Sequence, residues 1–255
     1  MTILKAILLG VVQGITEWLP VSSSGHLVIL QEFLGISQPL FFDILLHVST
    51  LVVIFIVFWR DINRIFKDLV RWNLKSESGK ILKFIIIGSI PTAALAIFFH
   101  KFFVFAFSGL KVVSAGLIFT SLLLFLSRKK ARQRKVGFFQ AILVGIAQGL
   151  ALVPGISRSG ATISTGLISG MERKKATKYS FFLVVPAIIG ATIFGFDKVV
   201  LGENLVSYFF GMLAALVVGY FSLKFLLKII EKGKFYIFGY YCLVLGCLLL
   251  IFCLV

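Results

Sequence analysis

The residues best suited to chemistry in this sequence form two short polar stretches. In the first, Gln13 and Glu17 are four residues apart, so both project from one face of a helix. The tip that follows, at residues 20–26, contains hydroxyl groups, a glycine and an imidazole. Together, His26, Ser23 and Glu17 would supply a nucleophile, a base and a group that orients the base or binds a metal ion. A purely structural histidine is the alternative.

Both stretches also have the features of an anion-binding site. Ser22 and Ser24 precede a point where a helix could restart, and the free N–H groups and positive dipole end of such a helix attract anions. The second stretch, at residues 154–162, places Arg158 among three hydroxyl residues, Ser157, Ser159 and Thr162. Arginine offers a rigid, charged fork that fits phosphate oxygens. A permanent ion pair between Arg158 and Glu17 is the alternative.

The two stretches belong to a duplicated segment. Residues 6–25 (AILLGVVQGITEWLPVSSSG) align without a gap with residues 141–160 (AILVGIAQGLALVPGISRSG). The small polar positions repeat, but the ionisable ones do not: Glu17 aligns with Leu152, and the arginine of the second copy aligns with a serine of the first. We therefore expect the first copy to perform the chemistry and the second to hold the anion.

Composition places the chain in a membrane. Of its 255 residues, 59% are hydrophobic, and the mean hydropathy of +1.05 exceeds what a soluble core can hide. The net charge of +16 comes from 26 Lys and Arg concentrated between apolar runs, which is typical of membrane topology rather than of a nucleic-acid-binding face.

We expect no cleaved signal peptide. Three cysteines in the last apolar run predict neither a disulfide framework nor a metal site, and these are Cys242, Cys247 and Cys253.

The apolar runs predict an all-α integral membrane protein of one domain. A helix needs about 20 residues to cross a bilayer, and six runs are long enough. We predict spans at residues 41–59, 83–99, 111–127, 178–196, 205–227 and 236–254. The duplicated segments, residues 2–36 and 138–170, are each two half-length apolar runs around a polar loop, which predicts re-entrant helical hairpins. Repeat one would then cover residues 1–127 and repeat two residues 138–255.

Loop charges orient these elements. Four segments are rich in Lys and Arg and should face the cytoplasm, namely residues 60–83, 128–135, 173–178 and 228–234. Residues 100–110 and 197–204 are nearly neutral. The first hairpin would then enter from outside and the second from inside, an inverted-topology repeat in which the two tips meet near the midplane. Both termini should lie outside the cytoplasm.

These groups favour phosphoryl chemistry on a lipid. A carboxylate inside a membrane costs at least about 2.5 kcal/mol unless it is paired, hydrated or bound to a cation, so Glu17 is a functional candidate rather than a snorkelling residue. Asp43 and His47 are also four residues apart and could add a second polar shell around the site. A purely structural pair of these two residues is an equal alternative. Four glycines, Gly10, Gly14, Gly145 and Gly149, predict close helix packing rather than a nucleotide loop. The sequence thus predicts a phosphorylated lipid substrate.

The two motifs also resemble those of a known family. Residues 13–27, QGITEWLPVSSSGHL, and residues 154–164, PGISRSGATIS, are similar to the two signatures of the undecaprenyl-diphosphate phosphatase, or bacitracin-resistance, family. The resemblance covers essentially the whole chain, including the spacing between the motifs. In that family the first motif is Glu or Gln, three residues, then Glu, so Gln13 takes the variable position and Glu17 the fixed one.

The resemblance implies hydrolysis of undecaprenyl diphosphate to undecaprenyl phosphate and inorganic phosphate. That reaction recycles the lipid carrier for peptidoglycan synthesis and confers bacitracin resistance. The resemblance also implies six spans plus two re-entrant helix-loop-helix units, a place in the bacterial cytoplasmic membrane, and dependence on a divalent cation, Mg²⁺ or Ca²⁺. The motif residues carried onto this chain are Glu17, Ser23, His26, Ser157, Arg158 and Thr162.

The resemblance leads to a hypothesis about roles. Arg158 grips the diphosphate together with Ser157, Ser159 and Thr162, while Glu17 holds a cation or a water molecule. Ser23 or His26 attacks the terminal phosphorus, or His26 activates water. Because Gln13 replaces a second carboxylate, one carboxylate, diphosphate oxygens and water would have to hold a cation such as Mg²⁺.

A secondary transporter or lipid flippase is the competing interpretation, because inverted repeats with broken helices are a transporter architecture. A transporter has little use for a nucleophile and a base confined to one repeat, so the asymmetry of the copies favours an enzyme. The expected partners are a polyprenyl diphosphate and membrane lipids, without nucleic acid. The sequence leaves a homodimer open.

Overall fold

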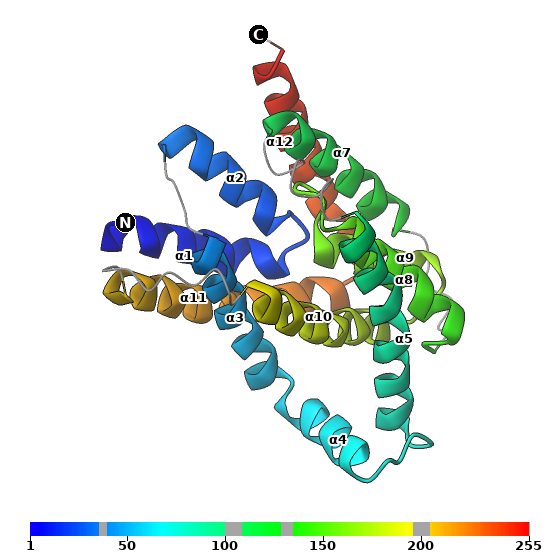
Figure 1. Ribbon diagram of the computed structural model, residues 1–255. Helices are drawn as coiled ribbons and strands as arrows, with labels where there is room; N and C mark the ends of the chain where they lie inside the picture. The colour runs from blue at the N-terminus through cyan, green and yellow to red at the C-terminus, as the bar shows by residue number, and fades with distance from the viewer. Residues whose placement is uncertain (36–39, 100–108, 129–134, 196–204, 255) are drawn as a thin grey trace.

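The computed structural model describes residues 1–35, 40–99, 109–128, 135–195 and 205–254, and all regular secondary structure in these ranges is helical (Figure 1). The predicted all-α fold is therefore confirmed for the described residues. In chain order the helices are α1 (Ile3–Trp18), α2 (Ser23–Leu34), α3 (Leu40–Val57), α4 (Trp59–Val70), α5 (Glu77–Phe98), α7 (Leu110–Leu126), α8 (Phe138–Leu150), α9 (Arg158–Ile168), α10 (Arg173–Gly195), α11 (Leu205–Glu231), the 3₁₀ turn η2 (Phe235–Ile237) and α12 (Phe238–Phe252).

Helix length and composition support a multi-pass membrane protein. In the described ranges, four helical segments are long and apolar enough to cross a membrane, namely Glu77–Phe98, Arg173–Phe194, Leu205–Glu231 and Phe235–Phe252. They overlap four of the six predicted spans. The other two predicted spans, 41–59 and 111–127, coincide with α3 and α7, and α3 counts as a fifth span only if its bent partner α4 is included. Most of the two near-neutral loops and part of the basic segment 128–135 lie outside the described residues.

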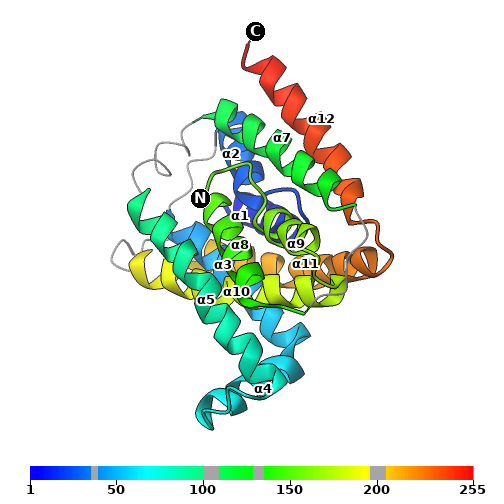
Figure 2. The same cartoon turned by 90° about the vertical axis from the view of Figure 1, so that its right-hand side faces the viewer.

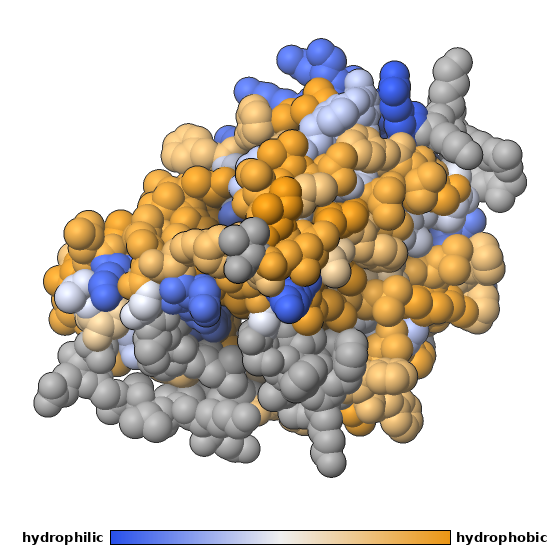
Figure 3. All heavy atoms as spheres, turned by 90° about the horizontal axis from the view of Figure 1, so that it is seen from above, coloured by the Kyte–Doolittle hydropathy of each residue, from blue (hydrophilic) through white to orange (hydrophobic). Residues whose placement is uncertain are grey.

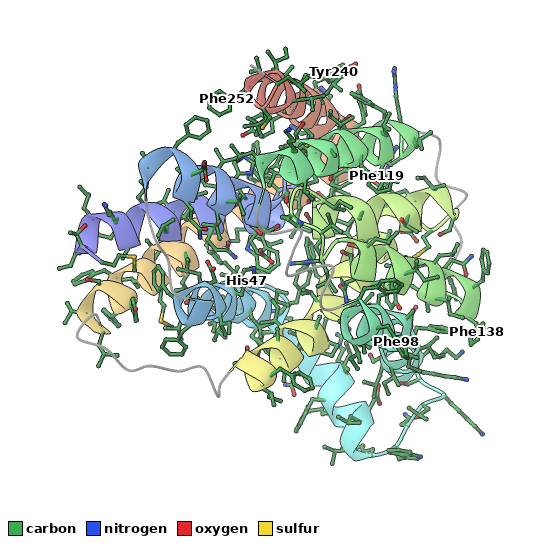
Figure 4. All side chains as sticks on the ribbon, turned by 45° about the horizontal axis from the view of Figure 1, so that its top comes forward. His47, Phe98, Phe119, Phe138, Tyr240 and Phe252 are labelled. Atoms are coloured by element: carbon green, nitrogen blue, oxygen red, sulfur yellow. The ribbon has the colours of Figure 1, made fainter. Side chains whose placement is uncertain are left out.

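The surface agrees with this assignment. Figure 3 shows a face made mostly of hydrophobic side chains, with hydrophilic residues in small separate groups. Large aromatic side chains project from the periphery in Figure 4, and the ring of Phe98 is 83% exposed. A soluble protein would bury such side chains, whereas a lipid environment accommodates them.

Each duplicated segment folds as two helices joined by a short polar loop. The tip between α1 and α2 covers residues 19–22, and the tip between α8 and α9 covers residues 151–157. Ser22 and Ser157 are the helix N-caps, because their hydroxyls accept hydrogen bonds from N–H groups three residues later, at 3.2 and 3.1 Å. The predicted helix restart is confirmed at both tips.

The two tips contact each other, as predicted. Gly155 N–H donates to Ser22 Oγ across 3.1 Å, and Ser159 Oγ donates to Leu19 O across 3.3 Å. Gly155 has a φ of +91°, and a Cβ there would lie 2.2 Å from Val113 O, so only glycine fits. Figure 2 shows α1, α8 and α9 near the middle of the molecule. Polar side chains from both copies are thus brought to one place.

Glycines allow each duplicated segment to pack closely against a long helix from the other half of the chain. A Cβ at Gly10 in α1 would lie 2.1 Å from Gly211 O in α11, and one at Gly145 in α8 would lie 2.1 Å from Gly88 O in α5. The expectation that these glycines allow close packing is confirmed. Each copy of the duplicated segment therefore packs against a helix from the other half of the chain.

The basic segments gather at one end of the molecule. Lys178 Nζ in α10 donates to both carboxylate oxygens of Asp61 in α4, at 3.0 and 2.9 Å. A second group of contacts surrounds a small cavity at the ends of α7, α10 and α11, lined by Arg128, Arg173 and Gly233 among others. These contacts bring together members of all four Lys- and Arg-rich segments.

Candidate active site

Glu17 lies at the centre of a buried polar cluster where the two tips meet. Its Oε1 forms an ion pair with Arg158 Nη2. Its Oε2 accepts hydrogen bonds from Ser23 Oγ at 2.7 Å and from Gln13 Nε2 at 3.0 Å. The Glu17 side chain is only 5% exposed, so both oxygens exchange water for protein donors. The carboxylate of one copy and the guanidinium of the other therefore form one site.

Arg158 is the first residue of α9, so the N-cap at Ser157 sets its position. Its guanidinium also lies over the ring of the fully buried Trp18, 5.6 Å from the ring centroid. Two buried atoms of this site, Arg158 Nη1 and Gln13 Oε1, have no hydrogen-bond partner among the described residues. Arg158 can thus hold Glu17 with one nitrogen and offer the other to an anion.

His47 in α3 belongs to the same cluster. Figure 4 labels its side chain on α3. Its Nε2 lies 3.6 Å from Glu17 Oε2, and its Nδ1 donates to Asp43 O at 2.8 Å. A carbonyl oxygen only accepts, so Nδ1 carries a proton, and a second proton on Nε2 would pair the ring with Glu17. The sequence alone did not decide whether Asp43 and His47 form a structural pair or take part in function. The structure places the imidazole against the carboxylate, while the Asp43 carbonyl orients the ring.

His26 points to a different partner from the one its motif suggested. Its Nδ1 donates to Ser22 O at 2.8 Å, which leaves Nε2 to accept from the Tyr241 hydroxyl at 2.7 Å. The two rings also stack, with centroids 5.8 Å apart and an interplanar angle of 9°. The bond to the carbonyl one turn earlier directs the ring toward α12, so neither ring nitrogen bonds Ser23 or Glu17.

Sequence reasoning missed Tyr241. It lies in an apolar run, 215 positions from His26, and no neighbouring polar residue marks it. A tyrosine in an apolar run is usually an interfacial or packing residue, so the sequence predicts no functional role for it. Only the packing of α12 brings its hydroxyl to the imidazole.

The remaining hydroxyl residues of the motifs mainly build the tips. The hydroxyls of Ser22 and Ser24 lie 3.3 Å apart, and those of Ser157 and Ser159 repeat this distance. Thr162 Oγ1 donates to Arg158 O at 2.7 Å and is fully buried, so it supports the helix turn that carries the arginine. Ser23 differs, because its hydroxyl is the one that donates to the catalytic candidate Glu17.

Comparison with known proteins identifies the family. Residues 6–248 match the family model described as Bacitracin resistance protein BacA, and this range contains both tips. The chain belongs to the BacA family.

Relatives in the BacA family match along nearly the whole chain. An undecaprenyl-diphosphatase of Halothermothrix orenii is 42% identical over 260 residues, which cover 98% of each chain. One of Carboxydothermus hydrogenoformans is 42% identical over 97% of this chain and 96% of its own. One of Korarchaeum cryptofilum is 38% identical over 96% of this chain and 97% of its own.

The divalent cation suggested by the BacA motifs has few protein ligands available. The described residues include no group of three or more His, Cys, Asp or Glu side chains that could hold a metal ion. Glu17 and the unpaired Oε1 of Gln13 are the oxygens that a cation would meet. This pair fits a hydrated ion such as Mg²⁺, which takes most of its ligands from water and substrate oxygens.

Proposed function

We propose that this chain hydrolyses undecaprenyl diphosphate to undecaprenyl phosphate and inorganic phosphate. The observation that carries the proposal is the buried contact of Glu17 with Arg158 and Ser23 where the two tips meet. It combines a guanidinium group that can bind an anion, a hydroxyl and a carboxylate, all within the proposed membrane region. The chain belongs to a family whose members above are named undecaprenyl-diphosphatases, and it covers almost their full length.

Arg158 binds the diphosphate in this proposal. Its Nη2 stays oriented by Glu17, while Nη1, which has no described partner, donates to a phosphate oxygen. The N-termini of α2 and α9 end at the two tips, and their dipoles add positive potential there. The ion pair with Glu17 and the grip on substrate are thus compatible roles of one guanidinium.

Ser23 is the nucleophile that the geometry favours. Its Oγ bonds to the terminal phosphorus while the bond from that phosphorus to the bridging oxygen breaks, and undecaprenyl phosphate leaves. The hydroxyl proton passes to Glu17, which already accepts it across 2.7 Å. Water then attacks the phosphorus of the phosphoserine, the bond from phosphorus to Ser23 Oγ breaks, and inorganic phosphate leaves while Glu17 returns the proton to Oγ.

His26 serves the second step. With its proton on Nδ1, it keeps a lone pair on Nε2, which is the form that takes a proton from water. In the structure the Tyr241 hydroxyl donates a hydrogen bond to that lone pair, and the attacking water would replace the hydroxyl there. A bound cation would neutralise charge on the diphosphate from the side of Glu17 and Gln13.

We also propose six spans and two re-entrant hairpins, with both termini outside the cytoplasm of a bacterial cell. The contacts that gather the four basic segments at one end support this topology. Mg²⁺ or Ca²⁺ as the cation and a homodimer as the assembly are further proposals, which native mass spectrometry of the purified protein can test.

The deciding experiment measures inorganic phosphate released from undecaprenyl or farnesyl diphosphate by the purified protein with Mg²⁺ or Ca²⁺. Arg158→Ala should lose at least about 100-fold in kcat/KM, because it removes the phosphate donor and leaves a buried carboxylate unpaired. Arg128→Ala is the matched control, since Arg128 is exposed and lies over Tyr236 instead.

Near-normal phosphate release by Arg158→Ala would refute the assigned site. A transporter would instead move lipid across vesicles without releasing phosphate, although none of the relatives named above carries such a name.

A further inference from the structure

Helix α4 has an unusual division of its side chains. Arg60, Arg64, Lys67 and Arg71 follow one another at steps of four, three and four, so they line one face of the helix. The apolar residues Trp59, Ile62, Phe66 and Val70 follow at similar steps along another face. No residue of α4 is buried, so both faces are at least partly accessible. This is the pattern of a helix that lies at a membrane surface.

The direction of α4 agrees with that pattern. Its axis turns by 89° from that of α3, across the break at Phe58. If α3 crosses the membrane, α4 therefore runs nearly parallel to the membrane plane. Figures 1 and 2 both place α4 at the lower extremity of the molecule, next to the start of α5. The helix is thus positioned where headgroups would lie.

The acidic residues of α4 are already used by the protein. Asp61 binds Lys178 of α10, and Asp68 accepts hydrogen bonds from Ser76 Oγ at 2.6 Å and from Asn73 Nδ2 at 3.4 Å. By contrast, the described ion pairs include no carboxylate bound to the row of Arg60, Arg64, Lys67 and Arg71. The basic face therefore carries uncompensated positive charge toward the outside.

A shallow, open hollow of about 210 Å³ lies where the basic face adjoins the apolar one, between the side chains of Trp59, Arg60, Asn63, Arg64 and Lys67. Guanidinium groups bind phosphate oxygens in a bidentate manner, and the ammonium and amide add further donors. The indole of Trp59 is 61% exposed, and tryptophan favours the level of lipid headgroups. The walls thus combine the groups that recognise a phosphodiester with one that prefers the bilayer boundary.

We propose that the basic face of α4 is a binding site for the headgroup of an anionic phospholipid, which anchors α4 in the membrane interface. A lipid fits better than a nucleic acid or an acidic peptide because exposed apolar side chains adjoin the cations. Phe66 is 59% exposed and Val70 70% exposed, and both would enter the acyl boundary beneath the headgroup. The positive charge on α4 is complementary to an anionic lipid surface.

The test compares lipid binding by the full-length protein and two triple variants in detergent. One variant combines Arg60→Gln, Arg64→Gln and Lys67→Gln. The control combines Lys228→Gln, Lys232→Gln and Lys234→Gln, which removes the same charge from exposed residues at the end of α11. Phosphatidylglycerol, phosphatidylcholine and inorganic phosphate are titrated separately, and binding is followed by native mass spectrometry and by the unfolding midpoint.

We expect phosphatidylglycerol to bind the wild type and the control with equal affinity and the α4 variant at least about tenfold more weakly, since each cation near an anionic surface contributes to binding. Phosphate release from farnesyl diphosphate in detergent should stay unchanged in both variants, which also verifies folding. Equal binding of phosphatidylglycerol by the α4 variant would overturn the proposal. So would equal affinity for phosphatidylcholine, or a full effect of inorganic phosphate alone.

Discussion

At the scale of single residues, the site depends on one buried carboxylate with several donors. Glu17 contacts Arg158, Ser23, Gln13 and His47, so its charge is balanced from both repeats. Removing one member of a buried ion pair leaves the other charge without compensation, which costs about 3–5 kcal/mol. If Glu17 acts in the proposed reaction, a change at this residue should therefore affect both catalysis and stability.

Glu17→Gln should lower kcat at least about 100-fold with little change in KM, because it removes the proton acceptor but leaves the phosphate donors. It should also lower the unfolding midpoint, since Arg158 loses its counter-charge. Steady-state kinetics with farnesyl diphosphate and thermal unfolding measure the two effects. The double variant Glu17→Gln, Arg158→Met should regain stability but not activity. A double variant that is less stable than the single one would contradict the ion-pair argument.

Tyr241→Phe should lower kcat about 3- to 10-fold without changing KM, because the variant keeps the ring but loses the hydroxyl that, with Ser22 O, orients His26 until water replaces it. Tyr240→Phe is the matched control, since that ring packs against Phe125 instead. Nitrogen NMR of the His26 ring would report the loss of the hydrogen bond, and the unfolding midpoint should stay constant. Equal kinetics for the two variants would remove Tyr241 from a positioning role.

At the scale of elements, close helix contacts and loop caps hold the tips in place. The contact of α8 with α5 allows no side chain at Gly145, and the bond between Ser22 and Gly155 ties one tip to the other. Ser22 adopts a φ of 70°, an uncommon backbone conformation for a residue other than glycine. Such local strain persists only where surrounding contacts enforce it, as they do at this tip.

Gly145→Ala should destabilise the protein by about 1–3 kcal/mol, because the new methyl group would overlap the backbone of α5. Gly190→Ala is the control, since nothing lies within 4 Å of a Cβ at that helical position. The control should be neutral or more stable than wild type by about 0.5–1 kcal/mol. Unfolding midpoints in one detergent compare the variants, and equal midpoints would refute the packing argument.

At the scale of the whole molecule, the two copies of the duplicated segment meet, and the polar cluster needs residues from both. Glu17 and Ser23 come from the first copy, and Arg158 comes from the second. Contacts join the basic segments to one another, and α4 lies at the lower extremity of the molecule in Figure 1. In the proposed topology this arrangement would place the candidate site at depth and the charged ends in water or among headgroups.

The proposed topology predicts opposite labelling of two introduced cysteines. In a background without the native cysteines, Lys75→Cys should react with an impermeant maleimide only after the membrane is opened, because residues 60–83 face the cytoplasm. Lys5→Cys should react in intact cells from which the outer layers have been removed, because the N-terminus lies outside. Labelling of both positions from the same side would exclude the inverted arrangement.

Much of this architecture followed from local patterns. The two tips, their helix restarts and the close-packing glycines were predicted correctly, since caps and half-length apolar runs are short-range features. The partner of His26 was not predicted, because a hydrogen bond to Ser22 O directs the ring toward the hydroxyl of Tyr241 in α12. Helix α4 was also missed, because residues 60–83 were interpreted only as a basic segment between two spans.

The sequence by itself determined the membrane character, the helical class and the residue types available at the two tips, because these depend on composition and local spacing. Only the tertiary structure decided which charges pair. Glu17 and Arg158 lie in different copies of the duplicated segment, and the spacing of Asp43 and His47 did not show that the imidazole faces Glu17. Tyr241 comes from a helix whose pattern marks only an apolar run. Such contacts depend on how whole helices pack, and no short stretch of sequence encodes that arrangement.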